Sequence, residues 1–119
     1  MEYEAINLDS NSTLATNVKL AGTSKSRRKG LLGTDSLSAG SAIWITPCEA
    51  IHTFGMRLAI DALFLDRDLR IRKLSANLQP WRLSVCLSAT SVLELEAGTI
   101  SHSGSRIGDH VRFKVIGSH

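Results

Sequence analysis

Three side chains that bind soft metals recur at intervals of four after Pro47, namely Cys48, His52 and Met56. On one face of a helix, a thiolate, an imidazole and a thioether at this spacing would suit copper(I) or zinc. The segment is a poor helix, because Pro47 precedes it and Gly55 lies within it. On a strand, successive ligands would stand about 13 Å apart. Metal binding therefore requires a loop that folds back on itself.

Cys48 and His52 also suggest a second chemistry, in which the imidazole takes the proton of a thiol nucleophile. Such a pair needs a third group that orients the base, and Asp61 or Asp109 would supply a carboxylate. The sequence shows no recognisable oxyanion hole. In the structural alternative, His52 hydrogen-bonds the backbone, Cys48 is a small buried residue and Met56 fills the core.

Asp61 is the one charged residue in the apolar run 58–65. A buried carboxylate is costly unless it is paired or hydrogen-bonded, so this side chain requires partners. We expect it to accept hydrogen bonds from backbone N–H groups of residues 52–57, or to pair with Arg57. The alternative is a functional carboxylate at the edge of a pocket.

Short periodic segments predict the elements that would position these groups. Residues 58–66 form a buried strand, 66–68 a turn and 69–74 a more exposed partner strand. Residues at period two in the segment 14–20 predict a strand with one buried face, formed by Leu14, Thr16, Val18 and Leu20. Further strands are expected at 42–46, 91–96 and 111–115, and a turn or short helix from 97 to about 106.

These elements predict an α+β fold that is mainly β. We expect a small, compact antiparallel sheet or barrel-like domain with about five to seven strands and one or two short helices. The whole chain, residues 1–119, is expected to form a single domain, with residues 1–12 as a loosely attached N-terminal arm.

The composition excludes several classes of protein. Hydrophobic residues make up 43% of the 119 residues and charged residues 21%, which is typical of a globular domain and not of a disordered chain. No apolar run approaches the roughly 20 residues that span a bilayer, and the acidic start lacks a secretory signal. We therefore expect a cytoplasmic protein without a membrane span, in which Cys48 and Cys86 are reduced.

The most basic segment, residues 19–29, holds five basic residues and no acidic one. Because no aromatic residues are interleaved, the pattern is more typical of a solvated helix face than of a phosphate- or nucleic-acid-binding surface. Nucleic acid is therefore not an expected partner, although the role of Lys25–Lys29 stays open. The net charge of +3 permits an acidic partner without implying one.

Short motifs follow one another in a fixed order from about Val18 to Val115. They are Arg27–Gly33, Cys48 with Ile51–Met56, Ile60–Asp61 with Phe64–Asp66, Pro80–Arg82, Leu93–Leu95 with Ala97–Gly98, and Ile107–Asp109. Each motif is weak alone, but the ordered set resembles the prokaryotic family called domain of unknown function 192. The chain departs from the family pattern at Ala59, where proline is usual, and at Leu69, where a hairpin glycine is usual.

The resemblance implies one small α+β domain dominated by strands. It implies no activity, because none is established for the family. It does direct attention to one loop and one strand, whose most distinctive residues are His52, Thr53, Gly55, Met56 and Asp61.

We therefore favour a non-enzymatic ligand- or partner-binding module with a shallow, polar-rimmed cleft around the 52–56 loop. In this hypothesis Arg57 and Arg82 receive an anionic group, and Trp81 forms a flat apolar wall. The candidate ligand-binding residues are His52, Thr53, Met56, Arg57, Asp61, Trp81 and Arg82. We expect no cofactor, a small anionic ligand or a protein as partner, and a monomer or weak homodimer. The alternatives are an enzyme that uses Cys48 and His52, and the soft-metal site.

Overall fold

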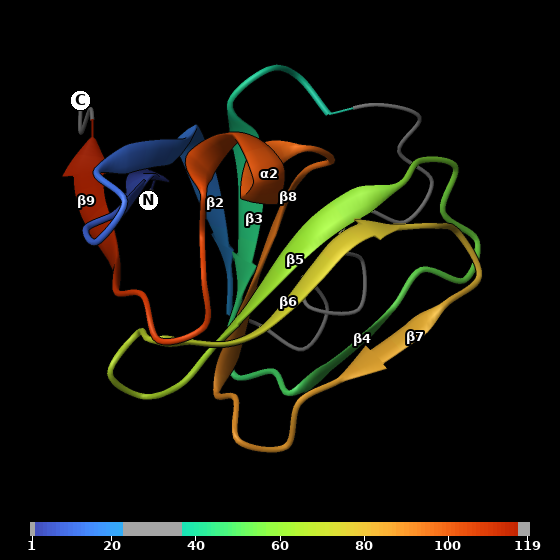
Figure 1. Ribbon diagram of the computed structural model, residues 1–119. Coiled ribbons are helices and arrows are strands. Elements are labelled where there is room, and N and C mark those ends of the chain that lie inside the picture. The colour runs from blue at the N-terminus through green and yellow to red at the C-terminus, as the bar shows by residue number, and fades with distance from the viewer. Residues whose placement is uncertain (1, 23–36, 117–119) are drawn as a thin grey trace.

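The computed structural model describes residues 2–22 and 37–116. Within these ranges the chain forms nine strands and one short helix (Figure 1). They are β1 (Glu2–Asn7), β2 (Ser12–Ala21), β3 (Ser41–Ile45), β4 (Ala50–His52), β5 (Ile60–Leu65), β6 (Ile71–Leu78), β7 (Leu83–Val85), β8 (Ser91–Glu96), α2 (Thr99–Ser103) and β9 (Val111–Ile116). The predicted mainly-β α+β class is confirmed. The strands outnumber the expected five to seven partly because β4 and β7, with three residues each, are too short to show a period.

Seven strands form one sheet in the order β6-β5-β8-β3-β2-β1-β9. Neighbouring strands are antiparallel except β2 and β3, which are parallel, so the sheet is mixed rather than purely antiparallel. Strands β4 and β7 pair separately as an antiparallel two-stranded sheet, here called the β4–β7 ribbon. Figure 1 shows this ribbon at the periphery of the molecule, on the side away from β1 and β9.

The two edge strands of the large sheet meet at one end only. An isolated bridge joins Arg70 to His110, the Ile71 N–H donates to the Asp109 carbonyl at 2.9 Å, and the Val111 N–H donates to the Leu69 carbonyl at 2.9 Å. Beyond these contacts β6 and β9 do not pair along their lengths. The sheet is therefore curled without being a closed barrel.

The central strands are buried on both faces, which explains their apolar sequences. All six residues of β5 are buried. On one face Leu63, Leu93 and other buried side chains form the first core cluster. On the other face Phe64 and Val92 belong to a second cluster, to which Ile51 of the β4–β7 ribbon contributes. The ribbon therefore packs over this second face.

In the N-terminal region one prediction is wrong, and the strand predicted at 14–20 is confirmed as β2 with only part of its expected buried face. Residues 2–7 do not form a loose arm, because β1 is hydrogen-bonded between β2 and β9. In β2, Leu14 and Val18 are buried as expected, but Thr16 and Leu20 are exposed. The pairing of β1 with β2 shifts register on both sides of Ala5, and such irregularities break strict alternation.

The predicted hairpin of residues 58–74 is confirmed as β5 and β6. Its turn places Leu69 at a φ of 63°, a left-handed conformation that favours the glycine expected there. The Asp66 carboxylate supports this turn by accepting from the N–H groups of Asp68 at 2.9 Å and Arg70 at 3.0 Å. The basic segment Lys25–Lys29 lies outside the described residues. In the part of the chain that the structure describes, no helix has the length and apolar character needed to cross a membrane.

Candidate functional site

Thr53 ties together two loops that are distant in sequence. Its N–H donates to the Arg82 carbonyl at 2.8 Å, and its carbonyl accepts from the Trp81 N–H at 3.0 Å. Its hydroxyl donates to the Gln79 carbonyl at 2.6 Å and accepts from the Arg82 N–H at 2.8 Å. Because Thr53 is completely buried, these bonds lock loop 53–56 and corner 79–82 into one unit. The hydroxyl is thus committed to the backbone, and Thr53 acts as a positioning residue.

This unit presents three stacked rings at the surface, here called the aromatic platform: His52, Phe54 and Trp81. The ring centroids of His52 and Phe54 are 5.0 Å apart, and those of Phe54 and Trp81 are 6.0 Å apart. Trp81 is 65% exposed although its backbone has a φ of 66°. A left-handed conformation costs a non-glycine residue about 1–2 kcal/mol, and the indole surface is mostly apolar, so its exposure to water is unfavourable apart from the N–H group. The fold therefore maintains an exposed indole at a cost.

Two exposed arginines lie close to the platform residues in sequence. Arg82 is exposed, and its Nη1 donates to the Trp81 carbonyl at 3.4 Å. Arg57 is exposed three residues beyond Phe54. His52 ends β4, and its Nδ1 accepts from the Phe54 N–H at 3.3 Å. Aromatic faces beside guanidinium groups can hold a ligand that has an apolar part and an anionic part.

Two candidate residues lie away from the platform. Met56 is buried in the second core cluster. Asp61 is also buried, and its carboxylate accepts from three backbone N–H groups: Asn77 at 2.8 Å, Gly98 at 3.1 Å and Ile100 at 2.8 Å. The expected partners in residues 52–57 are therefore wrong. The Asp61 side chain points to the other face of β5, where it anchors the turn and the first residues of α2.

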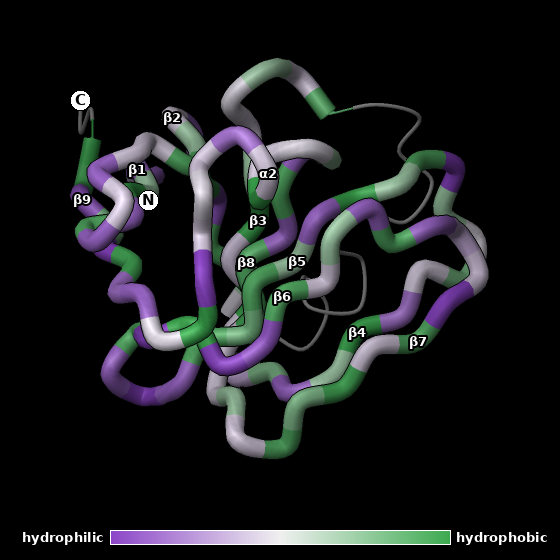
Figure 2. Tube along the Cα trace, viewed as in Figure 1, coloured by the Kyte–Doolittle hydropathy of each residue, from purple (hydrophilic) through white to green (hydrophobic). Residues whose placement is uncertain are grey.

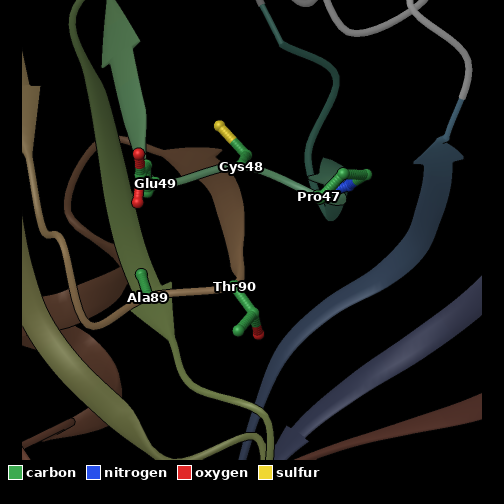
Figure 3. Close-up of a pocket in the computed structure, with 5 residues that line it drawn as sticks. All are labelled: Pro47, Cys48, Glu49, Ala89 and Thr90. Carbon is green, nitrogen blue, oxygen red and sulfur yellow. The ribbon is translucent and has the colours of Figure 1, made fainter.

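Cys48 lies at the opposite end of β4 from the platform. It lines a shallow depression of about 380 Å³ together with Pro47, Glu49, Ala89 and Thr90 (Figure 3). Its Sγ donates to the Ala50 carbonyl at 3.1 Å, and both cysteines of the chain are thiols. Among the described residues, no group of three or more His, Cys, Asp or Glu side chains is placed to hold a metal ion. The nucleophile and metal hypotheses for Cys48, His52 and Met56 stay predictions.

Sequence reasoning missed a buried carboxyl group, Glu94. It lies in the middle of β8, opposite Ile43 of β3 and Ala62 of β5, and only 3% of it is exposed. Burial raises the pKa of Glu94 to about 7, and within the described structure its Oε1 has no hydrogen-bond partner. The alternation Leu93-Glu94-Leu95 indicates a solvated Glu94 face. In the structure this second face of β8 is also covered. The alternation of a single strand carries no sign of this, because it depends on which elements pack over the sheet.

Comparisons with known proteins agree with this architecture. A protein of unknown function from Novosphingobium aromaticivorans superimposes with a TM-score of 0.80 at 21% identity, and the match covers 94% of this chain and 84% of that one. A candidate transcription regulator from Sinorhizobium meliloti gives a TM-score of 0.81 at 24% identity, covering 94% and 92% of the two chains. At these identities the likeness concerns the fold alone.

The comparison with curated proteins finds no match to this chain. The family model of DUF192, described as an uncharacterized ACR, matches residues 6–113. These residues include the platform, the Thr53 contacts and Glu94. The chain therefore belongs to the DUF192 family, as its ordered motifs predicted.

Proposed function

We propose that this domain is a non-enzymatic binding module whose contact surface is the aromatic platform with Arg57 and Arg82. The observation that supports this most directly is Trp81, an indole that is 65% exposed at a left-handed backbone position and stacked on Phe54. Backbone strain that the surrounding contacts maintain is concentrated at functional positions in proteins. Four hydrogen bonds of Thr53 hold the two loops in this arrangement before any ligand arrives.

The chemistry of the surface defines the ligand. Stacked rings favour an apolar or planar group, and the guanidinium groups of Arg57 and Arg82 favour a carboxylate or phosphate. The proposed ligand rests on the exposed rings of the platform, whereas the depression beside Cys48 lies at the other end of β4. Because Thr53 already holds the two loops in place, less conformational entropy is lost when a ligand binds to this open surface.

Fluorescence of Trp81 provides the test. Purified protein is titrated with small aromatic carboxylates and phosphates, and Trp81→Phe supplies the contribution of Trp44, the second tryptophan of the chain. We expect a saturable change in the emission of Trp81. Loss of a charge-assisted hydrogen bond in Arg82→Ala should weaken binding about tenfold. Arg112→Ala, an exposed change on β9, is the matched control and should bind normally. Unchanged emission together with unchanged thermal stability across the panel would refute the proposal.

A further inference from the structure

Exposed apolar side chains gather on the β4–β7 ribbon. Along the segment 81–87 every second residue is a large, exposed hydrophobic residue, here called the apolar stripe: Trp81, Leu83, Val85 and Leu87. Leu83 is 63% exposed and Leu87 79%. Phe54 of the platform adds to the same surface. Isolated apolar residues are normal on protein surfaces, whereas a continuous stripe marks a contact surface.

The pairing of the ribbon explains why the stripe faces outward. Ile51 pairs with Ser84, and both are buried against the body of the protein. The alternate residues therefore point away from it, and His52 lies opposite Leu83 on this outer face. Figure 2 shows hydrophobic residues along β7 at the periphery of the molecule, and Figure 1 shows that no described element covers that side.

Basic residues lie next to the stripe in sequence and in contact with the ribbon. Exposed Arg82 stands between Trp81 and Leu83, and exposed Arg57 follows Phe54 by three residues. The Lys73 amine donates to the Val85 carbonyl at 2.9 Å from β6, on the side of the ribbon that faces the body of the protein. The described segments 49–58 and 79–90 include the ribbon and its flanking loops. Glu49, just before β4, is the only acidic residue in these two segments. The whole chain carries a net charge of +3 and a pI of about 9.2. Charge complementarity thus favours an acidic partner and opposes a second copy, which would bring the same cations.

We infer that the outer face of the β4–β7 ribbon docks on an anionic lipid surface, with the apolar stripe entering the interface and the cations contacting headgroups. Apolar insertion and basic residues are each weak signals, and membrane binding becomes stable when they act together. Tryptophan is also the side chain that most favours the boundary between lipid and water. The inference rests on the proposed function, because it identifies what the platform contacts.

Vesicle sedimentation tests the inference with the full chain. Vesicles of phosphatidylcholine are compared with vesicles of phosphatidylcholine and phosphatidylglycerol, at low and high salt. We expect binding to the anionic vesicles only, and a loss of binding at high salt. Leu83→Glu should weaken binding at least tenfold, and Arg82→Ala about fivefold. Leu8→Glu makes the same change at an exposed leucine between β1 and β2 and should leave binding unchanged. Thermal melting verifies that each variant folds, and Leu87→Glu in the turn replaces any Leu83 variant that does not.

Several outcomes of the vesicle experiment would contradict lipid binding. Absence of sedimentation with anionic vesicles would overturn the inference, as would equal binding to both vesicle types or normal binding by Leu83→Glu. A dimer that forms with rising concentration and is disrupted by Leu83→Glu, without vesicle binding, would identify a second copy as the occupant. If small anions still change the emission of Trp81 while vesicles do not bind, the proposed function stands and this inference fails.

Discussion

Replacement of Glu94 by glutamine should make the protein more stable at alkaline pH while changing little in acid. Glu94 is buried between β3 and β5, and burial raises the pKa of its carboxyl group from 4.5 to about 7. In the unfolded chain the group ionises near its ordinary pKa. Between these two values the folded protein holds a proton that the unfolded chain has lost, so stability falls as pH rises.

The size of the effect follows from the two pKa values. Each tenfold change in a protonation equilibrium corresponds to 1.36 kcal/mol, so ionising Glu94 inside the fold costs about 3 kcal/mol. Below the unfolded pKa both states are protonated and the cost is absent. Above the folded pKa both states are ionised and the full cost is present. For a domain of ordinary stability, 5–15 kcal/mol, this is a substantial fraction.

Urea unfolding at pH 5 and pH 8 measures the effect. Because pH 5 already lies slightly above the unfolded pKa, the wild-type free energy of unfolding should fall between the two pH values by about 2.5 kcal/mol more than that of Glu94→Gln. All other ionisable groups are common to the two proteins and cancel in this comparison. Glu96→Gln, an exposed change two residues later in β8, is the matched control and should follow the wild type. Parallel pH profiles for wild type and Glu94→Gln would refute the reasoning.

Three further predictions concern the residues that position the loops. Thr53→Val retains the shape of the side chain but leaves the Arg82 N–H and the Gln79 carbonyl without a partner, so unfolding in urea should show a loss of about 2–3 kcal/mol. The same variant should bind the aromatic carboxylates and phosphates less tightly. Unchanged binding would mean that Thr53 does not position the platform. Asp61→Asn replaces a charge that accepts three N–H groups, and we expect thermal unfolding to reveal a loss of about 2–4 kcal/mol. A neutral result would mean that the amide supports α2 equally well. Gly98→Ala meets no atom within 4 Å, so its cost should be purely conformational, about 1–2 kcal/mol for a residue at a φ of 99°. A loss well beyond that range would point to a steric contact.

Much of the fold could be predicted because burial leaves a local record in the sequence. The apolar run of β5 and the Asp66-Arg67-Asp68 turn predicted the hairpin correctly. The strands β8 and β9 were likewise predicted from alternation. Strands β4 and β7 have three residues each, which is shorter than any reliable period. The bulged pairing of β1 with β2 disturbed the alternation, so the buried face of β2 was predicted only in part.

The candidate site could be predicted only as a list of residues. Histidine, tryptophan and arginine near loops are residue types that favour ligand contacts, and they indicated His52, Trp81 and Arg82. The mutual arrangement of these residues depends on Thr53, whose hydroxyl contacts a carbonyl 26 residues away. Nothing in the local sequence specifies such a contact. Met56 illustrates the converse, because the same loop motif contains a residue that belongs to the core.

By itself the sequence determined the β-rich class, the β5–β6 hairpin and the family, since these depend on local periodicity and on ordered motifs. Only the tertiary structure decided that Asp61 anchors α2, that Glu94 is buried and that the apolar stripe is exposed. The physical reason is common to all three. Alternation assigns side chains to two faces of a strand, but whether a face is covered depends on elements that pack from distant parts of the chain.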